Sequence, residues 1–185
     1  MEINTSIYSI GHGARPIDIF LQLLLKYDIN YVVDVRTKPR SRFNPQYNKD
    51  RFAAALREHG ITYVYMGDTL GGMPTDKSCY DQDGRVDYTK VKEKDFFKNS
   101  LARLKTAHEK NIRIACVCSE LAPCECHRSK LIGESLRELQ VPILHINKQG
   151  DLEDQATVIK KIRGEQEADL FGKPEENLKS RRIYL

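Results

Sequence analysis

The feature that most constrains this fold is the alternation of short apolar runs with longer amphipathic segments along the chain. Five runs rich in β-branched and aromatic residues predict strands, at residues 6–10, 31–35, 61–66, 112–118 and 141–146. The segments between them carry apolar residues at helical spacing. Strands that alternate with helices are typical of a mainly parallel sheet covered by helices on both faces. We therefore predict a Rossmann-like α/β domain of three layers with a mostly parallel sheet of about five strands.

The domain organisation follows from length and from the helical segments. A chain of 185 residues suits one domain of ordinary size. The second expected helix runs from about residue 48 to 60, where Gly60 ends it, and the third from about Tyr88 to Lys110. Residues 1–150 form the predicted domain. Residues 151–185 form a charged C-terminal tail, in which a short helix is expected to pack on the domain.

Composition favours a protein whose cysteines are reduced and that has no membrane partner. No run approaches the roughly 18 consecutive apolar residues of a membrane span, and the N-terminus lacks the pattern of a signal peptide. The five cysteines are odd in number and clustered, unlike a disulfide framework. We therefore expect a cytoplasmic protein. The net charge of +4 is compatible with a phosphate-bearing partner, but it is too small to indicate a nucleic-acid-binding surface by itself.

Polar or glycine-rich residues follow the predicted strands at the point where each strand ends. They are His12, Asp34, Arg36, the loop 67–72, Cys118 and Glu120. Ligands of open parallel sheets bind beyond the carboxyl ends of the strands, so these residues are expected at one edge. The helix that begins near residues 126–128 is expected to point free N–H groups at the same edge, which would make an anion site.

Four motifs give the chain a resemblance to a known family. In order, they are "SIGHG", "VVDVRTKPRSRF", "ITYVYMGDTLGG" and "CSELAPCECHRS". Their order and spacing over about residues 6–146 resemble the family called domain of unknown function 488. Two positions depart from the family pattern: Gly13 stands where a small hydroxyl residue is usual, and Cys124 is an additional thiol.

The resemblance implies a fold and a set of site residues, but no reaction, because the family's name assigns none. The residues carried over from the motifs are Asp34, Arg36, Leu70, Gly71, Gly72, Cys118, Glu120, Cys126, His127 and Arg128. Of these, Asp34, Arg36, Gly71, Gly72 and Arg128 are predicted to bind a ligand.

Two familiar cysteine sites fit this sequence poorly. A structural zinc site would draw on Cys118, Cys124, Cys126 and His127. Their spacing, C-x5-C-x-C, lacks the two separated C-x2-C or similar ligand pairs that are typical of zinc sites. The adjacent Cys126 and His127 are also expected to project in divergent directions, so we predict no metal site. A phosphatase-like loop would need a shorter gap than the one between Cys118 and Arg128.

Thiol chemistry on a bound organic ligand fits better. Cys126, near a helix N-terminus and beside His127 and Arg128, is expected to favour the thiolate. Cys118 could face it as the second thiol of a pair. His12 or His127 would carry protons, and Glu120 would act as a general base or orient a histidine. We predict that at least one of Cys118 and Cys126 is an accessible thiol of low pKa, whereas Cys116 is inert core.

The loop after the second strand allows a different class of function. It mixes basic and aromatic residues, namely Arg36, Lys38, Arg40, Arg42, Phe43, Tyr47, Lys49 and Arg51. In such a loop the basic side chains can bind a nucleic-acid backbone, and the aromatic side chains can stack on bases. It can equally be a solvated loop beside a pocket.

The favoured hypothesis is an enzyme that acts on a small anionic ligand, such as a nucleotide or a nucleic-acid fragment. Its catalytic residues would be Cys118, Glu120, Cys126, His127 and His12. The alternative is a non-enzymatic module for nucleic acid or another partner, with structural or metal-binding cysteines. The sequence identifies no cofactor, substrate or oligomeric state, and it leaves open whether the protein is an enzyme.

Overall fold

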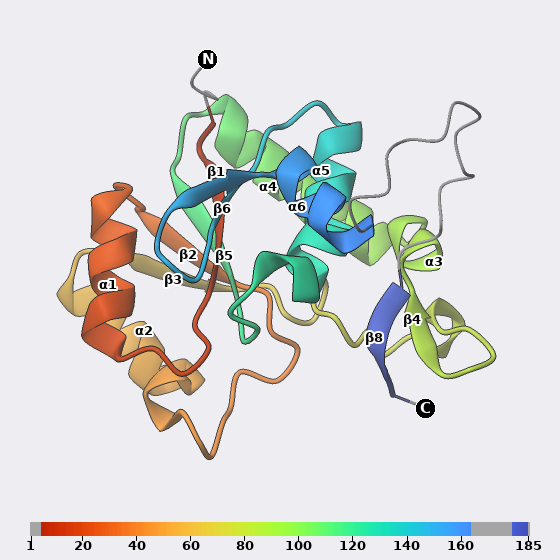
Figure 1. The fold of residues 1–185 in the computed structure, drawn as a ribbon, viewed down its shortest axis with the longest axis horizontal. Coiled ribbons are helices and arrows are strands. Elements are labelled where there is room, and N and C mark those ends of the chain that lie inside the picture. Colours follow the sequence, from red (N-terminus) through yellow and green to blue (C-terminus); the bar gives the residue numbers. More distant parts are fainter. Residues whose placement is uncertain (1–4, 164–178, 185) are drawn as a thin grey trace.

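The computed structural model describes residues 5–163 and 179–184, and its centre is a six-stranded sheet (Figure 1). The strand order is β3-β2-β5-β1-β6-β7. The strands are β1 (Ile7–Gly11), β2 (Tyr31–Asp34), β3 (Thr62–Tyr65), β5 (Ile114–Cys118), β6 (Leu144–Ile146) and β7 (Leu152–Asp154). All neighbours pair in parallel except β6 and β7. The predicted mostly parallel sheet is therefore confirmed.

Six α-helices and a small second sheet complete the described part of the chain. The helices are α1 (Ile17–Lys26), α2 (Lys49–Glu58), α3 (Tyr88–Lys92), α4 (Asp95–Glu109), α5 (Glu134–Glu138) and α6 (Gln155–Arg163). The second sheet pairs β4 (Arg85–Asp87) with β8 (Lys179–Ile183) in antiparallel fashion. Within residues 5–163 and 179–184, none of the helices has the length and apolar composition that crossing a membrane requires.

Two apolar cores lie on opposite faces of the six-stranded sheet. Helices α1 and α2 bury one core against side chains such as Ile10, Val32 and Val117. Helices α3, α4 and α5 bury the other against side chains such as Val33 and Cys116. Figure 1 shows α1 and α2 on one side of the sheet and α4 and α5 on the other. This is the three-layer arrangement expected from the alternation of strands and helices.

The expected helix from Tyr88 to Lys110 is two helices. Helix α3 starts at the N-cap Asp87, whose carboxylate accepts hydrogen bonds from the backbone of the first turn. It ends before Lys94, whose backbone is extended (φ −80°, ψ 136°) and begins α4. The buried residues Tyr88 and Val91 of α3 are out of helical phase with Phe97, Leu101 and Leu104 of α4, so one continuous helix could not bury both sets on a single face.

The helix expected after the fourth predicted strand also differs. It begins as a π-helix, Arg128–Gly133, and continues as α5. π-Helices are rare and are often found at functional sites. The segment follows directly on Cys126 and His127, so the irregular turn lies at the candidate site.

The region assigned to the C-terminal tail contributes to the sheet. The chain turns at residues 147–150 and returns as β7, which pairs with β6. Helix α6 follows and buries Val158 and Ile159. The division of the chain at residue 150 stays a prediction, and residues 164–178 and 185 of that tail lie outside the described residues.

Candidate functional site

The carboxyl ends of β1, β2 and β5 lie side by side and position the candidate site. Gly11 is paired with Cys118, and Asp34 is paired with Val117. The backbone N–H of His12 donates to the carbonyl of Cys118 over 3.0 Å. The sheet register therefore carries the polar residues that follow these strands to one edge.

Two thiols and one imidazole form the centre of this edge, and we call them the thiol–imidazole cluster. Nδ1 of His127 lies 3.7 Å from Sγ of Cys118 and 3.6 Å from Sγ of Cys126. The three atoms all lie within 4.8 Å of one another, so they could hold a metal ion together. Cys118 comes from the end of β5, whereas Cys126 and His127 come from the turn before the π-helix.

The adjacent residues Cys126 and His127 converge, and the expected divergence of their side chains is wrong. Cys126 has an extended backbone (φ −116°, ψ 151°), whereas His127 is helical (φ −63°, ψ −19°). This change of backbone conformation turns both side chains toward Cys118. The additional thiol Cys124 lies outside the cluster and is half-buried.

The His127 ring is fixed from two sides. Its Nε2 donates to the carbonyl of Val35 over 3.1 Å, which leaves Nδ1 as the acceptor that faces the thiols. Gly72 packs against the ring, because a Cβ at Gly72 would lie 3.0 Å from Nδ1. The neighbouring Gly71 has a different reason to be glycine, since a Cβ there would lie 2.1 Å from the carbonyl oxygen of Gly67.

Glu120 adjoins the cluster through Cys118. The Cys118 thiol donates to Oε2 of Glu120 over 2.7 Å. Burial acts to raise the pKa of Glu120, but the hydrogen bond from Cys118 and the nearby His127 bring the pKa below its usual value. Burial acts to lower the pKa of His127, yet the neighbouring Cys118 and Glu120 raise it overall.

The prediction of an accessible thiol of low pKa is wrong for Cys118, and Cys126 is also inaccessible. Only 3% of Cys118 and 1% of Cys126 are exposed. Burial, followed by the interaction with Cys126, raises the pKa of Cys118 well above that of an ordinary thiol. Cys116 is part of the core, as expected, and burial raises its pKa to about 12.

His12 lies at the same edge of the sheet, but its ring contacts residues other than those of the thiol–imidazole cluster. Its ring stacks on Tyr47 with centroids 4.2 Å apart. Its Nδ1 donates to the carbonyl of Gly13 over 2.8 Å, and its Nε2 accepts from Arg36 over 3.2 Å. Burial lowers its pKa to about 4, so the ring is neutral near pH 7. Both nitrogens are engaged, and the role of His12 as a proton carrier stays a prediction.

Asp34 and Arg36 form a buried ion pair. The guanidinium donates to the carboxylate through Nε (2.8 Å) and Nη2 (2.6 Å). The hydroxyl of Tyr63 donates to the same carboxylate over 2.7 Å. No sequence pattern pointed to Tyr63, because its contact with Asp34 depends on the pairing of β2 with β3. The predicted ligand-binding groups of this pair are thus largely occupied by each other.

Arg128 is wholly buried and anchors the loop of the cluster. Its Nη1 donates to the carbonyl of Glu120 (2.7 Å) and its Nη2 to that of Leu121 (3.0 Å). Gly11 makes room for it, because a Cβ at Gly11 would lie 2.5 Å from Nη1. The expected anion site at the start of this helix is also occupied, since the backbone N–H of Arg128 points to Sγ of Cys126 over 3.4 Å.

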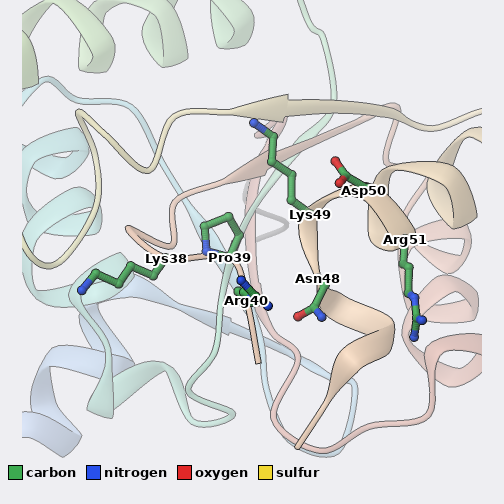
Figure 2. A pocket seen from close by; sticks show the side chains of 7 residues that line it. All are labelled: Lys38, Pro39, Arg40, Asn48, Lys49, Asp50 and Arg51. Atoms are coloured by element: carbon green, nitrogen blue, oxygen red, sulfur yellow. The ribbon is translucent and has the colours of Figure 1, made fainter. Parts of the chain in front are cut away.

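A cavity of about 510 Å³ lies in the loop after β2, and we call it the basic cavity (Figure 2). It is lined by Lys38, Pro39, Arg40, Asn48, Lys49, Asp50 and Arg51. These residues come from two segments, which the backbone hydrogen bond from Lys49 to Pro39 joins. Among residues 5–163 and 179–184, its four cations form no ion pair.

Comparison with known proteins gives one match. The family model described as domain of unknown function DUF488 matches residues 16–134, which confirms the resemblance drawn from the motifs. Comparison with curated proteins and with solved structures gave no match.

Proposed function

Because the chain belongs to the family described as domain of unknown function DUF488, which names no reaction, we propose a function from the geometry of the site. The protein is an enzyme that acts on a small anionic ligand. The thiol–imidazole cluster and Glu120 are its reacting centre, and the basic cavity supplies its anion-binding surface.

The single observation that carries this proposal is the convergence of two thiols on one nitrogen of His127, at 3.7 and 3.6 Å. A cysteine that only fills a core needs no polar partner, as Cys116 illustrates by its place among apolar side chains. Burying two thiols, an imidazole and a carboxylate together costs free energy unless each is paired. Such a cluster at the ligand-binding edge of a parallel sheet supports a chemical role.

The basic cavity supports an anionic ligand. Its volume of about 510 Å³ falls within the range of small-molecule sites. Four cations and one carboxylate line it, so its charge favours phosphate or carboxylate groups. The segment after β2 connects the two sites, because the Val35 carbonyl accepts a hydrogen bond from His127 and Lys38, three residues later, lines the cavity. None of the cluster residues lines the cavity.

A nucleic-acid-binding module is the second candidate, and Phe43 is the observation that favours it. Phe43 is 85% exposed, and the guanidinium of Arg42 lies 5.6 Å from its ring. An exposed aromatic ring beside basic side chains can stack on a base. Affinity for single-stranded DNA that is independent of Cys126 and lost on Phe43→Ala would favour this candidate.

The proposal is tested with inorganic phosphate and a panel of nucleoside monophosphates. We expect calorimetry to detect binding by the wild type, and mass spectrometry to detect conversion of at least one compound. Cys126→Ser should abolish conversion and keep binding, because it removes a reacting atom but no cation. Cys124→Ser is the matched control, since Cys124 is a neighbouring thiol outside the cluster.

The cavity is tested separately. Arg40→Gln combined with Lys49→Gln should weaken phosphate binding, whereas Lys105→Gln on α4 should not, because Lys105 lies outside the cavity. Binding that is equal in all three proteins would remove the basic cavity from the proposal. Conversion that persists in Cys126→Ser would remove the cluster.

A further inference from the structure

The thiol–imidazole cluster has the geometry of a metal site with three protein ligands. We propose that Cys118, Cys126 and His127 bind a single Zn²⁺ through two sulfur atoms and Nδ1. This inference deepens the proposed function, on which it rests for the role of the metal but not for metal binding itself.

The distances between the ligand atoms match tetrahedral zinc. Bond lengths of about 2.3 Å for Zn–S and about 2.0 Å for Zn–N, at tetrahedral angles, separate S and N by about 3.5 Å. The observed separations are 3.7 Å for Cys118 and 3.6 Å for Cys126. The same bond lengths separate two sulfurs by about 3.8 Å, and all three atoms lie within 4.8 Å of one another. The sulfur–nitrogen separations therefore need to change by only a few tenths of an ångström when an ion enters, and the sulfur–sulfur separation by at most about 1 Å.

The surroundings hold the ligands in the orientation that a metal needs. A metal-bound histidine commonly donates its other ring N–H to a carbonyl, and Nε2 of His127 does so to Val35. The backbone N–H of Arg128 points to the sulfur of Cys126 over 3.4 Å, which helps to fix the position of that sulfur. Arg128 also fixes the intervening loop through the carbonyls of Glu120 and Leu121.

The donor set selects the metal. Two thiolates and an imidazole are soft or borderline ligands that suit zinc, whereas Mg²⁺ and Ca²⁺ require oxygen atoms. Iron–sulfur clusters most often use four cysteines, and Cys124 lies outside this group. Zn²⁺ also compensates the negative charge of two buried thiolates.

The fourth position gives the metal a role in the proposed enzyme. Three protein ligands and one exchangeable position are typical of catalytic zinc. Oε2 of Glu120 accepts the hydrogen bond of the Cys118 thiol over 2.7 Å, so its carboxylate adjoins the cluster and could take up the proton that Cys118 loses when its sulfur binds zinc. A water molecule or an oxygen of the anionic ligand would occupy the fourth position, and a bound water could pass its proton to a nearby base.

The test is titration of chelator-treated, reduced protein with Co²⁺, followed by displacement with Zn²⁺. We expect one Co²⁺ per chain, with visible bands of tetrahedral cobalt and a thiolate charge-transfer band in the near ultraviolet. Cys118→Ser, Cys126→Ser and His127→Gln should each weaken binding more than the roughly 100-fold that loss of a supporting hydrogen bond costs. The controls Cys124→Ser and Cys79→Ser should bind as the wild type does.

X-ray absorption at the zinc edge of the wild type needs no variant and covers the case in which a variant fails to fold. Two sulfur scatterers at about 2.3 Å would support the site. A shell of oxygen and nitrogen alone, or the absence of one-to-one binding, would overturn it. The two proposals fail separately. Metal binding without conversion of any ligand contradicts only the proposed enzyme, whereas conversion by metal-free protein contradicts only the catalytic role of the zinc and leaves the binding site to be judged by the titration.

Discussion

The substitution Asp34→Asn tests whether Asp34 and Arg36 hold the fold together or are available to a ligand. Asp34 accepts two hydrogen bonds from the side chain of Arg36 and one from Tyr63. The side chains of the ion pair are 0% and 4% exposed. Asparagine keeps the shape of the side chain but leaves the buried guanidinium without its counter-charge.

The expected cost follows from this burial. Removing one partner of a buried ion pair destabilises a protein by about 3–5 kcal/mol, because the remaining charge is not compensated. In a chain of this size, 1 kcal/mol shifts Tm by about 2–4 °C. We therefore expect Tm to fall by roughly 6–20 °C.

The matched control is Asp28→Asn. Asp28 also pairs with an arginine, Arg113, but over 3.5 Å and with side-chain exposures of 80% and 44%. Water screens such a pair, so its loss should cost less than about 1 kcal/mol. Both variants replace one carboxylate by an amide and change the net charge equally, but they differ in how deeply the ion pair is buried.

The assays are thermal and urea denaturation, both followed by far-ultraviolet circular dichroism because the chain has no tryptophan. Adding Arg36→Gln to Asp34→Asn should recover part of the lost stability, because it removes the unpaired charge. Equal stability of Asp34→Asn and Asp28→Asn would refute the reasoning. Arg36 would then be free to bind an anion, as the sequence predicted.

Three further outcomes are expected. Burial lowers the pKa of His145 to about 4, so below about pH 6.5 this residue takes up a proton in the unfolded chain but not in the folded chain. His145 alone should therefore lower stability by about 2 kcal/mol between about pH 7 and about pH 4.5, in addition to the loss from His12, whose pKa is also lowered to about 4. Urea denaturation of His145→Gln should show a correspondingly smaller loss, and an unchanged pH dependence would contradict this role of His145. Gly11→Ala should destabilise the fold by about 1–3 kcal/mol in the same assay, because its Cβ would lie 1.9 Å from the carbonyl oxygen of Glu120. A variant as stable as the wild type would show that the backbone at Glu120 can move to accommodate the added methyl group. Affinity for single-stranded DNA, measured by fluorescence anisotropy, should fall steeply with salt if the loop around Phe43 binds nucleic acid, and a flat dependence would argue against that candidate.

The candidate site was only partly predictable from residue types. Cys118, Glu120, Cys126 and His127 were all named from the sequence, and the structure brings them together. The convergence of Cys126 and His127 was not predictable, because it depends on one change of backbone conformation between neighbouring residues.

The sequence by itself determined the layers and the edge of the sheet that carries the candidate site. Apolar runs separated by amphipathic helices leave few alternatives to a parallel sheet, since parallel strands need long crossover connections. The same order fixes which residues follow the strand ends, and so which side chains share an edge.

Only the tertiary structure decided what each side chain at that edge does. Arg36 and Arg128 are equally basic in the sequence, yet one is held by Asp34 and the other by backbone carbonyls of the loop. Such partners come from residues brought close by strand register and loop path, which local spacing does not encode. The same holds for the thiol–imidazole cluster, whose chemistry arises because β5 and the π-helix place two sulfurs around a single nitrogen.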